Sequence, residues 1–418
     1  MRSLITLLLL GLVNLSYGQL TYVKEITKEL CSPEYHGRGY AFQGDVKAAK
    51  YIASEFEKLG VDMLEDSYLQ EFTLDVNTFP GTMDVRMGEQ LLTPGKDFIV
   101  DANSGSFKGT FSTLVIDTTV LKTQLLLEDI IRQVKESKDK AFLIDTRGLD
   151  SRRANAMKAN LLGLSVYAPV VFLTQEKFMW SVGRKQYSHP IILLKSESYQ
   201  DGEDFTVDIA AEFVKSYKAY NVIGQVKAKN KTKKTVVFTA HYDHLGRMGE
   251  STYFPGANDN ASGTAMLISM AKYFKENPVD YNVIFIAFGG EEAGLVGSKY
   301  FVEHPMIKLN KIRFLLNLDI MGSGEEGITL VNGSVHSEEF DLMQKINSED
   351  KLLSKINKRG PTQNSDHYFF SLKGVPSFFI YTMGPNKHYH DIFDTYDELS
   401  FKECTDITQL LIRFVESL

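Results

Sequence analysis

The sequence of 418 residues predicts an α/β fold, in which helices cover both faces of a mixed central sheet and a β-rich domain is inserted. From Asn221 onward the chain repeats the order strand, loop, helix, which is typical of such a sheet. Between residues 83 and 208 the pattern changes to short β-like runs separated by polar turns. The length also favours more than one core. We therefore expect residues 19–82 and 209–418 to form the main domain and residues 83–208 an inserted one.

The first 18 residues have the features of an export signal. Arg2 precedes an apolar run from Leu4 to Val13 that is too short to cross a bilayer, and small residues surround Gly18. The alternative is a buried N-terminal strand or helix. We expect cleavage after Gly18 and a mature protein that is periplasmic or extracellular. No later stretch is long and apolar enough to be a membrane span.

The predicted elements follow in order along the chain. Apolar residues at helical spacing predict a short helix over residues 23–30 and a clearer one over 45–59, which Gly60 ends. In the predicted insertion we expect strands at 112–116, 141–145, 170–173 and 191–194, and a helix near 125–135. In the main domain we expect strands at 235–240, 282–288 and 313–318, and helices over 265–274 and 294–303.

Charge and cysteine content exclude some functions. The net charge of −7 gives no basic face for nucleic acid. Cys31 and Cys404 lack the spacing of a zinc or redox motif, so we expect no catalytic role for them. In an oxidising compartment they could pair or remain as two buried thiols, and the sequence leaves both possibilities open.

Two clusters of polar residues follow predicted strands closely. His241 stands at the end of one strand, and Asp243 two residues later could accept its second N–H. The adjacent acids Glu291 and Glu292 follow another strand, where one carboxylate could bind a metal while its neighbour accepts a proton. A structural histidine and helix-capping acids are the competing explanations.

Three further residues complete a possible metal site. Asp319 interrupts an apolar strand end, and His390 belongs to a polar segment that could be a surface loop. Asp259 lies in a loop before a helix, where a turn or a cap would explain it equally well. Together the five clusters offer nitrogen and oxygen ligands without sulfur, which suits Zn²⁺ with an open position. Three carboxylates with two histidines fit two metals that share a bridging carboxylate, about 3.5–4 Å apart.

These motifs together resemble the secreted two-zinc aminopeptidases, a family of the zinc exopeptidase type that also includes glutamate carboxypeptidase II and glutaminyl cyclase. The resemblance covers most of the chain outside the insertion and rests on H-Y-D-H, N-D-N-A-S-G, G-G-E-E-A-G, L-D-I-M-G, S-D-H and Y-H. It implies two zinc ions per chain. His241 and Asp319 would bind the first zinc, Glu292 and His390 the second, and Asp259 both.

The resemblance also implies an activity. Glu291 would be the general base and acid, Asp243 would orient His241, and Tyr389 would stabilise the oxyanion during hydrolysis of the N-terminal peptide bond. The substrates would be peptides with a free N-terminus, and the insertion would be a protease-associated domain. The sequence does not indicate an oligomeric state.

Three alternatives remain. Glutaminyl cyclase shares the fold, but the resemblance would then imply a pocket rich in tryptophan. The single tryptophan of this chain, Trp180, lies in the insertion. A non-catalytic binding protein on the same scaffold would be expected to lose ligands, and every ligand position here is filled. Cleavage of the kind that glutamate carboxypeptidase II performs would require arginines at the pocket, and the sequence does not place Arg38, Arg247 or Arg313.

Overall fold

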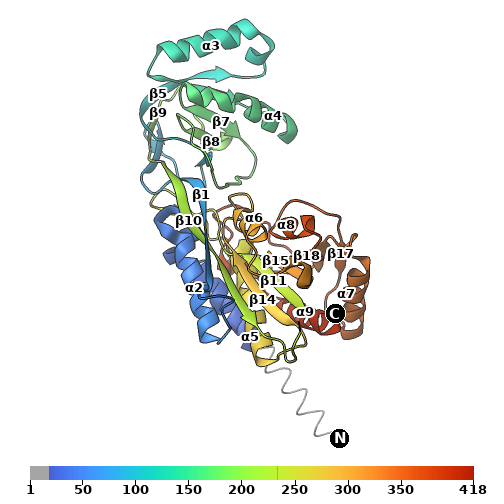
Figure 1. Ribbon diagram of the computed structural model, residues 1–418. Helices are drawn as coiled ribbons and strands as arrows, with labels where there is room; N and C mark the ends of the chain where they lie inside the picture. Colours follow the sequence, from blue (N-terminus) through green and yellow to red (C-terminus); the bar gives the residue numbers. More distant parts are fainter. Residues whose placement is uncertain (1–17, 233) are drawn as a thin grey trace.

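The computed structural model describes residues 18–232 and 234–418, and residues 18–30 are helical. The predicted export signal therefore lies outside the described residues, except for Gly18. Figure 1 shows two α/β parts, each built on its own sheet and joined by a pair of long strands. The prediction of an α/β fold with a mixed sheet is confirmed.

The main sheet has eight strands, and its centre is parallel. Strands β14, β11, β15 and β18 run parallel to one another, β10 and β1 extend one side antiparallel, and β16 pairs antiparallel with β18. The order across the sheet is β1 (Leu69–Thr78), β10 (Glu212–Val226), β14 (Asn282–Phe288), β11 (Thr235–His241), β15 (Ile312–Asp319), β18 (Ser377–Thr382), β16 (Ile328–Val331) and β17 (Ile356–Lys358).

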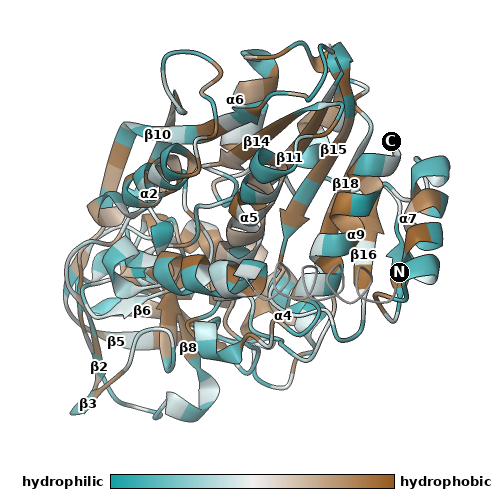
Figure 2. Ribbon diagram, turned by 90° about the horizontal axis from the view of Figure 1, so that it is seen from below, coloured by the Kyte–Doolittle hydropathy of each residue, from teal (hydrophilic) through white to brown (hydrophobic). Residues whose placement is uncertain are grey.

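Helices cover both faces of this sheet because the side chains of its buried strands alternate between the faces. In β11, Val236 and Phe238 pack into a core shared with α2, α5, α7 and α9, whereas Val237 packs into a separate core with α6 and α8. The central strands are largely apolar along their length (Figure 2). The helices are α2 (Gly44–Lys58), α5 (Gly263–Glu276), α6 (Val296–Glu303), α7 (Ser337–Asp350), α8 (His367–Leu372) and α9 (Cys404–Ser417).

A second eight-stranded sheet lies within residues 83–209. Its centre, from β5 to β8, is parallel. The order is β3 (Gln90–Leu91), β2 (Met83–Met87), β9 (Phe205–Ile209), β5 (Phe107–Ile116), β6 (Lys140–Asp145), β7 (Val170–Thr174), β8 (Ile191–Lys195) and β4 (Phe98–Val100), and the helices are α3 (Gln124–Glu136) and α4 (Ser151–Leu161). Helix α4 was not predicted, because only Met157 and Leu161 are buried in it and the apolar periodicity is weak.

The chain leaves the main sheet through β1 and returns to it through β10. These two strands pair antiparallel from Leu69↔Val222 to Thr78↔Glu212, with one irregularity near Asp75. Figure 1 shows the pair running from the main sheet to the second one. The sequence analysis predicted neither strand, because both carry charged residues on their exposed side.

Two smaller findings concern the cysteines and the possibility of membrane spans. Cys31 and Cys404 are both free and buried, and burial raises the pKa of the two thiols to about 11 and about 12. None of the helices in the described part of the chain combines the length and the apolar character that a membrane crossing requires.

Candidate metal centre

Three of the predicted site residues are gathered by the parallel centre of the main sheet. His241 is the last residue of β11, Asp319 is the last residue of β15, and Glu292 follows β14 after a turn through Gly289 and Gly290. Because these strands are parallel neighbours, their carboxyl ends lie at the same edge of the sheet, where α/β folds place their ligands.

Asp259 reaches the same edge from the segment that precedes α5. The backbone of this segment is irregular at Asp259 and Asn260. Its N–H groups at Asn258 and Asp259 donate to the buried Asp394 carboxylate at 2.9 and 3.0 Å. The segment begins at Gly256, which has a φ of 55°, and a Cβ there would lie 2.3 Å from the His244 ring. Only glycine fits this close approach.

Arg38 fixes the start of the same segment. Its guanidinium is fully buried and donates to the carbonyl oxygens of Pro255 at 2.7 Å and Gly256 at 2.6 Å. It also donates to Tyr242 at 2.7 Å and to Leu30 at 2.9 Å. Arg38 is therefore a structural residue that joins the N-terminal region to the metal site.

The carboxylate of Asp259 lies between two histidines. Its Oδ1 is 3.3 Å from His241 Nε2, and its Oδ2 is 3.2 Å from His390 Nε2. Asp319 Oδ1 is 3.5 Å from the same nitrogen of His241, and Glu292 Oε2 is 3.2 Å from that of His390. The structure thus brings all five predicted ligands together as two groups that share Asp259.

His244 is a further residue at the site, to which the sequence analysis assigned no role. Its ring is fully buried, and Nδ1 lies 2.8 Å from Glu292 Oε1. His244, Asp259 and Glu292 together could also hold a cation. The only signal in the sequence was its place in the same H-Y-D-H motif as His241.

Asp243 has more partners than the one expected of it. The carboxylate is 3.9 Å from His241 Nδ1, whereas the backbone carbonyl of Asp243 is closer to that nitrogen, at 3.2 Å. The carboxylate also accepts the backbone N–H groups of Glu291 at 3.1 Å and Glu292 at 3.2 Å, and the hydroxyl of Tyr40 at 3.2 Å. Asp243 therefore connects the His241 loop to the turn that carries both glutamates.

Ser365 supports Asp319 in a comparable way. Its hydroxyl donates to Asp319 Oδ2 at 3.3 Å and accepts a hydrogen bond from Asn317 at 2.8 Å. The sequence analysis noted the S-D-H motif but gave Ser365 no role.

The donor set fits a metal. Asp319 Oδ1 is buried and has no hydrogen-bond partner among the described residues. Buried polar atoms without partners are costly, and a bound cation at this edge of the sheet would satisfy the ligand group. His241, Asp259 and Asp319 all offer ligand atoms within 4.8 Å of one another. Imidazole and carboxylate ligands without thiolate are typical of zinc sites that leave a position open.

Charges at the site shift the pKa values of its members strongly. Burial raises the pKa of Glu292, but the nearby charge of His390 and the hydrogen bond from His244 lower it to about 2. Burial lowers the pKa of His390, but Glu292 and Asp259 raise it to about 11. Burial raises the pKa of Glu291 well above its usual value, and the neighbouring carboxyls of Asp366 and Glu292 add to this effect.

The site opens into a pocket of about 310 Å³. Glu291 and Tyr389, both expected to be catalytic, line it, and the Tyr389 ring stacks on His390 with 3.9 Å between centroids. The other lining residues are His241, Asp259, Glu292, Asp319, Ile320, Arg359, Asn364, Phe379, Tyr381 and His390.

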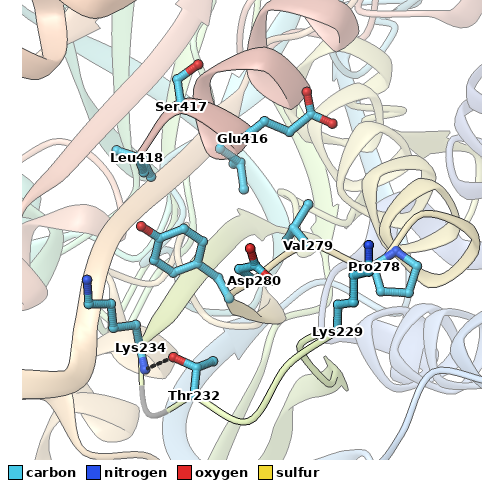
Figure 3. A pocket seen from close by; sticks show the side chains of 11 residues that line it. Lys229, Thr232, Lys234, Pro278, Val279, Asp280, Glu416, Ser417 and Leu418 are labelled. Carbon is cyan, nitrogen blue, oxygen red and sulfur yellow. Dashed lines mark hydrogen bonds between the residues drawn. The ribbon is translucent and has the colours of Figure 1, made fainter.

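A larger cavity of about 540 Å³ lies elsewhere (Figure 3). It is lined by residues that precede β11 and β14, among them Thr232, Lys234 and Tyr281, and by the end of α9. It therefore opens at the amino ends of the parallel strands and contains none of the candidate ligands.

Residues 221–415 match peptidase family M28. The M28 region begins in β10 and includes every candidate metal ligand and Glu291. The family resemblance seen in the sequence is thereby confirmed.

Two relatives of this chain are described as aminopeptidases. The aminopeptidase YwaD of Bacillus subtilis is 30% identical over 278 residues, which are 63% of this chain and 56% of that protein. A probable leucine aminopeptidase of Trichophyton verrucosum is 24% identical over 221 residues, which are 50% of this chain and 58% of that protein. The matches thus span less than two thirds of these relatives.

Solved structures extend the likeness to the whole fold. A zinc aminopeptidase from Bacillus subtilis superimposes with a TM-score of 0.70 at 20% identity, over 95% of both chains. A peptidase M28 precursor from Shewanella amazonensis gives a TM-score of 0.67 at 16% identity, over 97% of this chain and 95% of the other. The fold, with the main sheet and the second sheet together, is therefore shared with these solved structures.

Proposed function

We propose that this protein is a zinc-dependent exopeptidase, and specifically an aminopeptidase that removes the N-terminal residue of peptides. The observation that carries the proposal is the position of Asp259, whose two carboxylate oxygens face His241 and His390 separately. A carboxylate in that position suits two metal ions held side by side. The match of residues 221–415 to peptidase family M28 and the aminopeptidases among the relatives support the same activity.

Two zinc ions would occupy the two ligand groups. His241 and Asp319 would hold the first and His390 and Glu292 the second, with Asp259 shared. His390 is preferred to His244 as the ligand, because its Nε2 faces both Asp259 and Glu292, whereas the nearer nitrogen of His244 already contacts Glu292. When bound, zinc supplies Lewis-acid activation of water and of the scissile carbonyl.

The remaining chemistry belongs to the side chains. The Glu291 carboxylate accepts the proton of the attacking water and returns it to the leaving amine nitrogen. Its partly exposed position in the pocket gives it access to both. The Tyr389 hydroxyl donates to the oxyanion as it develops. The Asp243 carboxylate accepts the backbone N–H of Glu291. This hydrogen bond holds the base close to the two groups of metal ligands.

A second candidate activity is favoured by one observation. Arg359 lines the pocket, its Nη1 donates to the hydroxyl of Tyr381 at 3.4 Å, and no carboxylate of the described residues lies within 4 Å of it. Arg38 and Arg313, by contrast, are engaged elsewhere, the latter with Glu339. A guanidinium with no carboxylate partner suits a substrate carboxylate, either an acidic side chain or the C-terminus of a dipeptide.

The glutaminyl cyclase alternative receives less support. The indole of Trp180 donates to the Val100 carbonyl and stacks on Phe254 at 4.6 Å between centroids, inside the core of the second sheet. The aromatic residues of the pocket are instead Phe379, Tyr381 and Tyr389.

The deciding experiment is a screen of aminoacyl and N-blocked dipeptide substrates, with zinc content measured in parallel. Activity restricted to unblocked substrates, with two zinc ions per chain, is the expected result. Efficient cleavage of N-blocked dipeptides that end in an acidic residue would favour the second activity instead. In that case Arg359→Ala should reduce kcat/KM for acidic substrates about 10- to 100-fold, the value of one charge-assisted hydrogen bond, and leave neutral substrates unchanged.

Export of the protein is part of the proposal. It rests on the charge, apolar run and small residues of the first 18 positions. N-terminal sequencing of the secreted protein would be expected to start at Gln19.

A further inference from the structure

A loop of the second sheet's region touches the loop that carries His390. The backbone N–H of Trp180 donates to the carbonyl of His390 at 2.9 Å, and Nδ1 of His390 lies 3.0 Å from the carbonyl oxygen of Trp180. A carbonyl can only accept, so Nδ1 carries the hydrogen. In the neutral imidazole, the Nε2 that faces Asp259 and Glu292 then has the lone pair, as a metal ligand requires.

Lys177 binds the same loop at three points. Its Nζ lies 2.7 Å from the Asp391 carboxylate and donates to the carbonyl oxygens of Lys387 at 2.8 Å and Tyr389 at 3.3 Å. The Asp391 side chain is only 5% exposed, so the lysine neutralises a buried charge. Removing one partner of such a pair is more disruptive than the loss of a surface ion pair.

His390 needs this support because of its backbone. Its φ is 55°, in the left-handed region, which is uncommon for residues other than glycine. A backbone held in that region persists only when its surroundings enforce it. The two hydrogen bonds with Trp180 act on His390 itself, and Lys177 binds the carbonyl immediately before it.

The supporting loop is itself rigidly held. The Trp180 ring is buried, its Nε1 donates to the Val100 carbonyl at 2.8 Å, and it stacks on Phe254. On the other side of the contact, Ile392 packs against the core of the second sheet. The two loops are therefore fixed to one another by apolar packing as well as by polar contacts.

We infer that the region between β1 and β10 completes the metal site: Lys177 and the main chain of Trp180 are positioning groups that hold His390 as a metal ligand. This region is then a working part of the peptidase. The inference rests on the proposed role of His390.

The test is the Lys177→Met variant of the full chain loaded with zinc chloride. Zinc transfer to a chromophoric chelator is followed over time, and thermal unfolding of the zinc-free protein is measured beside it. We expect one of the two zinc ions to be lost about 10- to 100-fold faster than from the wild type, the usual effect of removing a group that orients a ligand. The zinc-free unfolding temperature should fall because Asp391 loses its partner, but the variant should remain folded under the conditions of the zinc measurement, and Lys177→Arg should restore slow release.

Lys108→Met is the matched control. Lys108 forms an exposed ion pair with Asp208 at 2.6 Å in the same region, away from the His390 loop, so its loss should leave zinc release unchanged. If Lys177→Met fails to fold, Asp391→Asn removes the same ion pair from the other side and should give the same selective loss. Wild-type zinc release from a folded Lys177→Met or Asp391→Asn protein would overturn the inference.

The outcome is separable from the proposed activity. Selective zinc loss in a protein whose wild type hydrolyses no peptide would support the positioning role and reject the aminopeptidase proposal. Unchanged zinc release from the variant of a protein that hydrolyses peptides would reject the positioning role and support the aminopeptidase proposal.

Discussion

The carboxylate of Asp394 accepts the backbone N–H of Asp259 at 3.0 Å, and it also accepts the N–H of Asn258. This contact holds the backbone of Asp259, the proposed bridging ligand, in place. Asp394→Ala would leave two buried N–H groups without a partner. We expect it to lower the free energy of unfolding of the zinc-free protein by about 1–3 kcal/mol and to weaken zinc binding about 10- to 100-fold.

Urea unfolding of the zinc-free protein and zinc titration together check this prediction. Asp394→Asn is the matched control, because its amide oxygen can still accept one N–H group, and it should lie between the wild type and Asp394→Ala in both measurements. Equal zinc affinity in all three proteins would contradict the role given to Asp394.

Asp259 and His390 should differ in how many metal ions they hold. Because only Asp259 faces both histidines, Asp259→Ala should reduce the affinity for both zinc ions, whereas His390→Ala should reduce the affinity for one. Zinc content after dialysis, measured by atomic emission, gives the count directly. Loss of a single zinc ion from Asp259→Ala would show that Asp259 does not bridge.

Residues that end or follow buried strands could be found from the sequence alone. His241, Asp319 and Glu292 follow apolar runs, and the order of a parallel sheet then brings them to one edge. Asp259 could not be found in this way, because it lies in an irregular segment before a helix, where an acid is commonplace. For this residue the prediction depended on the family resemblance.

The supporting contacts were beyond prediction for a different reason. Glu292 pairs with His244 across 48 positions, Asp259 with Asp394 across 135, and Lys177 with Lys387 across 210. Such pairs depend on the order of strands in the sheet and on how the second sheet packs beside the first, and no local pattern encodes either. The sequence analysis did not predict strand β10, because the first half of this strand carries exposed charged side chains.

Glu291→Gln should separate chemistry from metal binding. The amide keeps the shape of the side chain but cannot accept the proton of the attacking water. We expect kcat to fall about 10²- to 10⁴-fold while the zinc content stays at the wild-type level. Steady-state kinetics on the best unblocked substrate, with zinc measured on the same samples, would test this.

Glu303→Gln serves as the control for that measurement, because Glu303 lies at the end of α6 in an exposed pair with Lys299 and should leave kcat unchanged. Near-normal turnover by Glu291→Gln would reject the role of Glu291 as the base.

Asp45 should make the stability of the fold depend on pH. It lies in the first turn of α2, fully buried, where Tyr217 donates to Oδ1 and Oδ2 has no partner among the described residues. Burial raises the pKa of Asp45 from 3.8 to about 8, although the Tyr217 hydrogen bond opposes this. The folded protein therefore keeps a proton that the unfolded chain releases above about pH 4.

It follows that the contribution of Asp45 to stability is largest below pH 4 and is lost as the pH rises towards 8, by up to about 1.4 kcal/mol per pH unit. Asp45→Asn is neutral at every pH and should lack this decline. Urea unfolding of the two zinc-free proteins at several pH values between about 5 and 8 measures the effect. The stability of Asp45→Asn relative to the wild type should increase with pH across that range, and a constant difference would show that Asp45 is ionised in the folded protein throughout.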